Sequence, residues 1–255
     1  MSELKFSQIK LVLFDLDGTI YNGNQLIPNA DLVVQYFREQ NKIIRFGTNN
    51  STKSRSSIAT KLNTLGVTCT PDEIVTSSFL AAEYVKRTEL NHCFVFGEDG
   101  LIFDLTEHGI DICGEENAEN LVIGFSKNLD YDYLSQAFRV AKKAKRIIAC
   151  NLDRSYPAGD GKVYPGCGLI VSGIEWCANR KSDIVVGKPS TYMLRYLQQT
   201  EHVSASEMLC IGDGEETDAG MAISFGSPCY LIGSQRVQNG VACINHIAEI
   251  MDLDS

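Results

Sequence analysis

Short apolar segments alternate with helical patterns along almost the whole chain, and this alternation restricts the fold more than any other feature. The first segment, Leu11 to Phe14, is apolar at every position, which is typical of a parallel strand covered on both faces. Pro28 then opens a helix with one apolar face, formed by Leu32, Val33, Tyr36 and Phe37. Chains that alternate strands and helices in this way form doubly wound sheets with right-handed crossovers. The sequence therefore predicts an α/β fold with a doubly wound parallel sheet.

The same alternation predicts the remaining elements and their division into two domains. Further strands are expected at 42–46, 74–75, 93–96, 121–123, 146–150, 184–187, 208–212 and 229–232. Further helices are expected before Gly66, at 77–88, 131–144, 189–200 and 218–225, around Val171, Ile174 and Ala178, and at the C-terminus. The pattern from 184 onward matches that of the first region. We therefore expect a core of residues 1–82 and 182–255, interrupted by a smaller inserted α/β domain at 83–181.

The composition excludes several classes of protein. The chain has 255 residues, of which 44% are apolar and 22% charged, as in an ordinary globular protein. Its net charge of −9 argues against binding to the phosphate backbone of nucleic acids. Because the chain has neither a membrane-length apolar run nor an apolar signal segment, we expect a cytoplasmic protein that does not enter membranes. The nine cysteines form no C-x-x-C motif, so we expect buried, reduced thiols rather than disulfides or a zinc site.

Polar clusters follow four of the predicted strands, at the edge of an open α/β sheet where ligands bind. They are Asp15-Leu16-Asp17-Gly18-Thr19, Thr48-Asn49-Asn50, Gly187-Lys188-Pro189, and Gly212-Asp213 followed by Thr217-Asp218. Together they would gather four carboxylates, which repel one another strongly unless a cation lies among them. The oxygen-only ligand set favours a hard cation, Mg²⁺ in particular. Lys188 and the backbone N–H groups after Thr48 suit a phosphate dianion.

This set of side chains predicts phosphoryl-transfer chemistry. Asp15, at the tip of its strand, would attack phosphorus and form an aspartyl-phosphate. Asp17 lies two residues on, on the same side of an extended chain, and would act first as general acid and then as general base. Asp213 would ligate the metal, with Asp218 close behind as a ligand or as a group that orients one. The positive charges of Mg²⁺ and Lys188 would offset the repulsion between carboxylate and phosphate.

The four motifs resemble those of the haloacid dehalogenase-like phosphatase superfamily. They are DLDGT at 15–19, Thr48 at a strand end, Lys188, and GD-x4-D at 212–218. The segments IYNGNQLIPNA, GTNNS, NLDRSYP, PGCG and VVGKPS are similar to the class IIA branch. That branch includes nitrophenylphosphatases, pyridoxal phosphate phosphatases and bacterial nucleotide phosphatases. The resemblance extends over about residues 10–233.

The resemblance implies a Rossmann-like core with an inserted cap domain. It implies Mg²⁺ held by the Asp15 carboxylate, the Asp17 backbone carbonyl and the Asp213 carboxylate. Phosphate would be held by Thr48, Asn49 and Lys188. The expected activity is hydrolysis of a small phosphorylated metabolite, a phosphomonoester, and a homodimer formed through the cap domains would fit the branch.

Other functions use a similar set of residues and stay open at this stage. A phosphotransferase or phosphomutase would form the same aspartyl-phosphate but pass the phosphoryl group to another acceptor. A non-catalytic phosphate-binding regulator would need a strand-end Asp, a Thr and a Lys around Mg²⁺. The acid/base position of Asp17 and the cap-sized insertion disfavour a regulator, since a switch needs neither. A dehalogenase would not need Asp17 to protonate an alkoxide.

The inserted domain offers its own candidates for substrate contact. Asn151, Asp153 and Tyr156 lie in the segment NLDRSYP, although capping and turn hydrogen bonds are the alternative role for such residues. The Gly-rich segment 159–168 is expected to be a loop, because it contains no phosphate-binding glycine motif. Trp176 is expected in the core or at a cap interface, on the apolar stripe of its helix.

Overall fold

The structure is a computed structural model that describes residues 6–157, 162–233 and 241–253. The chain forms two compact units. The first unit holds the described residues of 1–48, 58–75 and 188–255, and the second holds those of 49–57 and 76–187. The second unit thus interrupts the first in sequence, and each has its own parallel sheet.

The first unit is built on a six-stranded sheet with the order β14-β13-β12-β1-β4-β5. The pairings from β14 to β4 are all parallel, and this confirms the predicted α/β fold with a doubly wound sheet. The strands are β1 (Leu11–Phe14), β4 (Ile43–Thr48), β5 (Ile74–Thr76), β12 (Met208–Gly212), β13 (Cys229–Ile232) and β14 (Val241–Ile244). A two-stranded hairpin follows β1 and consists of β2 (Tyr21–Asn22) and β3 (Gln25–Leu26).

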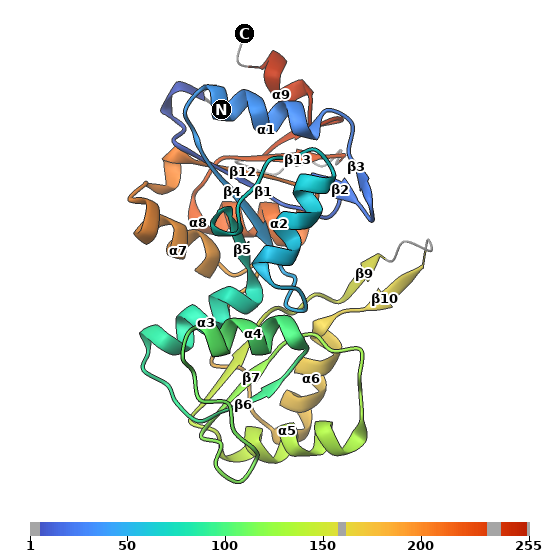
Figure 1. The fold of residues 1–255 in the computed structure, drawn as a ribbon, viewed down its shortest axis with the longest axis vertical. Coiled ribbons are helices and arrows are strands. Elements are labelled where there is room, and N and C mark those ends of the chain that lie inside the picture. Colours follow the sequence, from blue (N-terminus) through green and yellow to red (C-terminus); the bar gives the residue numbers. More distant parts are fainter. Residues whose placement is uncertain (1–5, 158–161, 234–240, 254–255) are drawn as a thin grey trace. The chain divides into compact units, whose positions relative to one another are not determined.

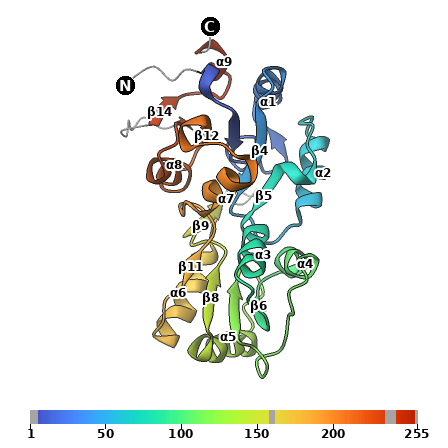
Figure 2. The same cartoon turned by 90° about the vertical axis from the view of Figure 1, so that its left-hand side faces the viewer.

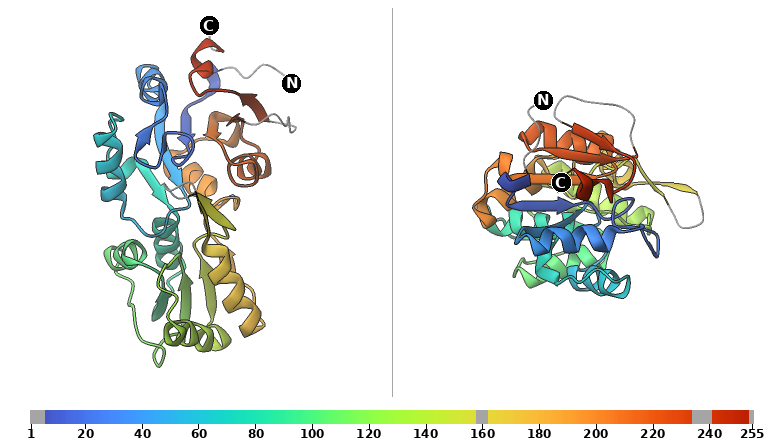
Figure 3. Two further views of the ribbon diagram at one scale, coloured as in Figure 1. Left: turned by 90° about the vertical axis from the view of Figure 1, so that its right-hand side faces the viewer. Right: turned by 90° about the horizontal axis from the view of Figure 1, so that it is seen from above.

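Helices lie on both faces of this sheet (Figure 1). On one face are α1 (Ala30–Glu39), α2 (Arg55–Thr64) and α9 (Glu249–Asp252), whose apolar residues form one core with Val12, Phe14, Ile44, Phe46, Leu209 and Ile211. On the other face are α7 (Tyr192–Glu201) and α8 (Gly220–Phe225), and the same layering can be followed in Figure 3. In α1 the expected face is partly wrong, because Leu32 is 53% exposed and Val34 is buried in its place.

The remaining short elements of the first unit lie between these. Short 3-10 helices cover Phe6–Gln8, Pro71–Glu73 and Ala205–Glu207, and a π-helical turn covers Glu215–Ala219.

The central position of β1 matters most for function. Its neighbours are β12 and β4, and Phe14 lies in register with Ile211 and Phe46. The three strands therefore present the residues that follow them at the same edge of the sheet.

The second unit has a four-stranded parallel sheet with the order β11-β8-β7-β6. Its strands are β6 (Cys93–Phe96), β7 (Asn120–Ile123), β8 (Arg146–Ala149) and β11 (Ile184–Val185). Figure 2 shows α3 (Ser77–Arg87) and α4 (Asp99–Glu107) on one face of the sheet, and α5 (Tyr131–Lys143) and α6 (Cys167–Ala178) on the other. An antiparallel hairpin of β9 (Ser155–Pro157) and β10 (Val163–Pro165) completes the unit.

Four expectations about the elements need correction. The strand at 184, expected in the core, pairs with β8 in the second unit. Helix α4 and strand β14 did not stand out in the sequence. The Gly-rich segment 159–168 contains β10 and the start of α6, whereas its residues 159–161 lie outside the described part of the chain. Trp176 is 87% exposed on α6 and so does not belong to the core, whereas its alternative place at a cap interface stays a prediction.

The cysteines agree in large part with expectation. All nine lie in the described residues and carry free thiols, and six of them are buried. Two others are half-buried, and Cys177 is exposed.

In the described part of the chain, no helix is long and apolar enough to span a membrane.

Candidate active site

Three carboxylates from two neighbouring strands meet at the carboxyl edge of the first sheet. Asp15 directly follows β1 and its backbone N–H donates to the Ile211 carbonyl at 2.8 Å, which ties it to β12. Asp213 directly follows β12, and Asp218 lies in the π-helical turn after it. Asp15, Asp213 and Asp218 each offer a carboxylate oxygen, and these atoms lie within 4.8 Å of one another. The structure thus brings together residues nearly 200 positions apart in the sequence.

The turn that carries Asp218 depends on two glycines. The Gly214 N–H donates to Asp218 Oδ2 at 3.1 Å. A Cβ atom on Gly212 would overlap the Asp218 carboxylate, and one on Gly214 would overlap the Thr217 hydroxyl. Single-turn π-helical distortions occur often at functional sites, where they redirect a side chain. Here the turn directs the buried Asp218 carboxylate back toward Asp15 and Lys188.

Lys188 is 3% exposed and joins two of the carboxylates. Its Nζ donates to Asp15 Oδ1 at 2.5 Å and to Asp218 Oδ1 at 2.7 Å. Burial alone would lower the pKa of Lys188, but the charges of Asp15 and Asp218 outweigh it and raise that pKa. The ammonium group therefore keeps its charge in a buried place, which is what binding of a phosphate dianion requires.

The carboxylates are crowded enough to need a cation. Burial raises the pKa of Asp15, against the opposing effect of Lys188, and the nearby Asp218 and Asp213 charges raise it further. Burial, followed by the charge of Asp218, raises the pKa of Asp213 to about 6. Burial is the largest cause of both shifts, and the mutual repulsion of the carboxylates adds to it. The oxygen donors and their spacing fit a hard divalent cation bound beside Lys188.

Asp17 is not one of these three carboxylates, although its charge contributes to raising the pKa of Asp213, and it has further partners of its own. Its Oδ2 accepts a hydrogen bond from the Tyr21 hydroxyl at 3.4 Å. Lys61 of α2 lies with Nζ 3.3 Å from the centre of the Tyr21 ring. Burial raises the pKa of Asp17, and the Lys61 charge opposes the shift. The Asp17 carboxyl group thus retains a proton to higher pH than an exposed aspartate, as a general acid needs.

Tyr21 and Lys61 did not stand out in the sequence as neighbours of the site. Tyr21 could have been identified from the sequence, because it lies only two residues after the DLDGT motif. Lys61 carries no such signal, since it belongs to an unremarkable polar helix and reaches Tyr21 only through the packing of α2.

Thr48 and Asn49 are consecutive but belong to different units. Thr48 ends β4 and is buried, at the edge where Asp15 lies. The Asn49 side-chain N–H donates to Asp153 Oδ1 at 2.8 Å, and the Asn151 side chain donates to the Asn49 carbonyl at 2.7 Å. Two of the candidates for substrate contact, Asn151 and Asp153, therefore bind the Asn49 segment within the second unit.

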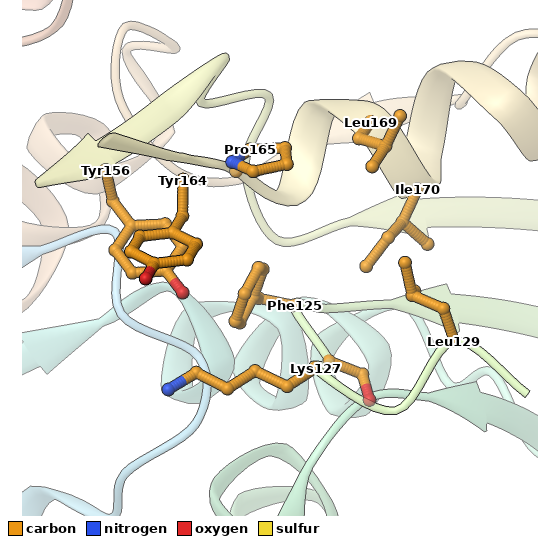
Figure 4. A pocket seen from close by; sticks show the side chains of 10 residues that line it. Phe125, Lys127, Leu129, Tyr156, Tyr164, Pro165, Leu169 and Ile170 are labelled. Carbon is orange, nitrogen blue, oxygen red and sulfur yellow. The ribbon is translucent and has the colours of Figure 1, made fainter. Parts of the chain in front are cut away.

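Tyr156, the third candidate from that segment, lies elsewhere in the second unit, in a pocket of about 450 Å³ (Figure 4). Its ring stacks on that of Tyr164 with 5.9 Å between centres, and Phe125 meets it edge-on at 5.3 Å. The pocket is lined by Phe125, Ser126, Lys127, Leu129, Tyr156, Tyr164, Pro165, Gly166, Leu169 and Ile170. It is mostly apolar and offers one ammonium group.

A second group of metal-type donors lies in the second unit. His92, Asp111 and Cys113 bring one donor atom each within 4.8 Å of the others. His92 and Asp111 have side chains 51% and 56% exposed and are hydrogen-bonded at 2.6 Å. Their exposed hydrogen bond to each other accounts for the proximity of His92 and Asp111.

Comparison with known proteins agrees with this geometry. Residues 12–111 match the family model for haloacid dehalogenase-like hydrolases, and residues 185–242 match a further model of the same kind. The chain is 35% identical to the sugar-phosphatase AraL of Bacillus subtilis, over 95% of this chain and 92% of the relative. It is 31% identical to the acid sugar phosphatase of Staphylococcus saprophyticus, over 82% of this chain and 80% of the relative.

A solved structure is similar over the whole fold. The p-nitrophenyl phosphatase from Archaeoglobus fulgidus superposes with a TM-score of 0.90 and 28% identity, over 96% of this chain and 98% of that chain. Sequence, fold and the grouped carboxylates agree, so the chain belongs to the haloacid dehalogenase-like hydrolases, in their class IIA phosphatase branch, and is a phosphoric monoester hydrolase.

Proposed function

We propose that the protein is a Mg²⁺-dependent phosphatase that hydrolyses a small phosphorylated metabolite through an aspartyl-phosphate on Asp15. The observation that carries this proposal is the meeting of Asp15, Asp213, Asp218 and Lys188 within hydrogen-bond and metal-ligand distance. The first unit would be the catalytic core. The second would be the cap that chooses the leaving group.

The reaction would take place in two displacements. In the first, an Asp15 oxygen attacks phosphorus, the bond from phosphorus to the leaving oxygen breaks, and Asp17 gives its proton to that oxygen. In the second, Asp17 takes a proton from water, whose oxygen attacks phosphorus. The bond between Asp15 and phosphorus then breaks, which releases orthophosphate and restores the carboxylate. The raised pKa of Asp17 supports the role of proton donor.

The phosphoryl oxygens would be bound by Lys188, Thr48 and Asn49. Lys188 would exchange one of its carboxylate partners for a phosphoryl oxygen and so keep its charge paired. A divalent cation would be held by the Asp15 and Asp213 carboxylates and the Asp17 backbone carbonyl, with Asp218 as a supporting group. When bound, it would supply positive charge that offsets the repulsion between the nucleophile and the phosphate.

For the substrate, we propose a sugar phosphate as the first class to test. Two relatives with high coverage are named as sugar phosphatases, and this supports the choice. Tyr156 stays a candidate for contact with the organic part of the substrate, since aromatic rings such as those of its pocket bind the apolar faces of sugars and other rings.

The direct test replaces the nucleophile. Asp15→Asn should lower the rate of p-nitrophenyl phosphate hydrolysis by about a thousandfold or more, because no carboxylate is left to attack. Asp132→Asn, an exposed change on α5, serves as the matched control and should keep the wild-type rate. Equal rates for Asp15→Asn and wild type would exclude Asp15 as nucleophile.

The same assay separates hydrolysis from phosphoryl transfer. A phosphatase releases orthophosphate in many turnovers per enzyme molecule, at a rate that does not depend on an added alcohol or sugar acceptor. A phosphotransferase or phosphomutase would release little orthophosphate, and would form a phosphorylated acceptor once an acceptor is added. A phosphate-binding regulator would release at most one equivalent of p-nitrophenol per protein molecule and then stop.

A further inference from the structure

We propose that Ser77, Asn151 and Asp153 are positioning residues that hold Asn49 in place for phosphate binding. The inference rests on the proposed function, in which Asn49 binds the phosphoryl group. It assigns the segment NLDRSYP a different role from the one expected from the sequence, since its first and third residues would act through Asn49 and not on the leaving group. We call these three residues the Asn49 clamp.

The backbone carbonyl of Asn49 is fixed by two side-chain donors. Ser77 Oγ donates to it at 2.7 Å, and the Asn151 side-chain N–H donates to it at 2.7 Å. Ser77 also donates to the Asn50 carbonyl at 3.1 Å. Ser77 is fully buried and Asn151 is 3% exposed, so water does not readily replace either donor. The peptide that follows Asn49 is therefore held in one orientation.

The side chain of Asn49 is fixed at both ends of its amide. Its N–H donates to Asp153 Oδ1 at 2.8 Å. Its oxygen lies against Gly187, where a Cβ atom would approach it to 2.5 Å and would also overlap the Cys150 carbonyl. Gly187 therefore leaves room for the Asn49 amide, and this explains a glycine next to Lys188 in the sequence.

The clamp itself is rigid. The Asp153 N–H donates to Asn151 Oδ1 at 3.1 Å, and the Asp153 carbonyl accepts from the Gly168 N–H at 2.9 Å. A Cβ atom on Gly166 would overlap the Asp153 carbonyl, and one on Gly168 would lie 2.7 Å from the Leu152 carbonyl. The PGCG motif thus lets the start of α6 approach the turn at 151–153 closely. Groups held in this way are prearranged, so little ordering remains for the substrate to bring about.

The clamp makes a prediction that contact with the leaving group would not. Asn49 would bind the phosphoryl group, which all phosphomonoesters share. Loss of a clamp residue should therefore weaken the binding of all substrates, and of orthophosphate as an inhibitor, by the same factor. A residue that touches the leaving group would instead change the ranking of substrates.

The experiment uses adjacent serines as a matched pair. Ser77 and Ser78 are both fully buried in α3, but Ser78 Oγ donates to Asp104 and not to the Asn49 segment. Ser77→Ala and Asn151→Ala should each raise the inhibition constant of orthophosphate and the KM of p-nitrophenyl phosphate by about tenfold, the usual effect of losing one buried hydrogen bond. Ser78→Ala should change neither. Asp153→Ala should raise both constants by a similar factor, and Asp153→Asn, which keeps an acceptor for the Asn49 side chain, should recover most of that loss.

Three results would overturn the clamp. The first is an equal effect of Ser77→Ala and Ser78→Ala, with circular dichroism confirming that both variants are folded. The second is a change in the ratio of kcat/KM between a sugar phosphate and p-nitrophenyl phosphate in Asn151→Ala. The third is a wild-type protein that neither hydrolyses nor binds phosphate, and that result alone would also remove the proposed function.

Discussion

Gly18 lies where any side chain would displace the Asp213 carboxylate. Its φ of +89° is rare for other residues, and a Cβ atom would overlap Asp213 Oδ2. We therefore expect Gly18→Ala to weaken activation by Mg²⁺ by about 10- to 100-fold, the usual effect of disturbing a ligand through its neighbour. The Mg²⁺ dependence of p-nitrophenyl phosphate hydrolysis measures this.

A matched control is available five residues further along the chain. Gly23 also has a positive φ, +57°, but nothing lies within 4 Å of its Cβ position. Gly23→Ala should therefore cost some stability and leave the Mg²⁺ dependence unchanged. If both variants respond to Mg²⁺ in the same way, backbone strain and not the displaced carboxylate is the cause.

Asp213 illustrates a conflict between stability and function. Burial and the charge of Asp218 raise its pKa, so in the metal-free protein its ionised form destabilises the fold at neutral pH. Asp213→Asn should raise the Tm of the metal-free protein at pH 7. The same substitution should abolish the increase in Tm that Mg²⁺ causes in the wild-type protein. Calorimetry with and without Mg²⁺ tests both parts, and a lower Tm for the variant would contradict the argument.

The residues that we propose carry the chemistry could be found in the sequence, and those that contact and support them could not. Asp15, Lys188 and Asp213 are polar residues next to apolar strands, a position with few structural uses. Lys61 reaches Tyr21 from a helix face, and Ser77 reaches Asn49 from a helix start. Such contacts depend on how helices pack against neighbouring segments, which a local pattern does not encode.

Among the elements, α5 offers the clearest stability test. Asp130 caps this helix, with its carboxylate accepting from the Tyr133 N–H at 3.0 Å. Asp130→Ala should lower the free energy of unfolding by about 1 kcal/mol, the usual cost of a lost N-cap. Asp132→Ala, in the first turn of the same helix, lacks this capping role and should cost less. Urea unfolding of both variants decides, and equal costs would mean that the cap contributes nothing of its own.

Elements were predictable where their pattern is strong. The strand at Leu11 to Phe14 has the predicted bounds, and α5 differs from its prediction by one residue at its end. The two-residue strand at Ile184–Val185 was assigned to the wrong sheet, because nothing in so short a segment indicates its partner. Helix α4 escaped prediction because its apolar residues, Leu101, Ile102, Phe103 and Leu105, do not keep to one face.

At the scale of the whole molecule, metal binding should govern both activity and stability. Removal of divalent cations with a chelator should stop hydrolysis, and excess Mg²⁺ should restore it. At a concentration about 100 times its dissociation constant, Mg²⁺ should raise the Tm by about 5 °C or more. Full activity in excess chelator would exclude a role for the metal.

The effect of pH on this stabilisation has a definite sign. With a pKa of about 6, the Asp213 carboxylate is ionised and able to bind metal above that pH and protonated below it. The increase in Tm due to Mg²⁺ should therefore shrink as pH falls through about 6. In the metal-free protein the sign is reversed. As pH rises from about 4 to about 6, Asp213 is ionised in the unfolded chain but still protonated in the fold, so stability falls over that range and then levels off. Calorimetry between about pH 4 and 8 covers both cases.

The cytoplasmic location, the lack of nucleic-acid binding and the homodimer stay predictions from the sequence. A parallel sheet with helices on both faces follows from the alternation of elements, and so does the insertion of a second α/β unit. Where the insertion begins does not follow, because Asn49 to Ser57 resembles an ordinary connection after a strand.

That beginning has a practical consequence for exchanging parts between relatives. Thr48 and Asn49 are joined by one peptide bond, yet Asn49 takes its partners from the second unit, together with the rest of 49–57. A chimera that transplants only the contiguous stretch 76–187 would pair foreign donors with the recipient's own Asn49. Active chimeras should require segments 49–57 and 76–187 to come from the same parent protein.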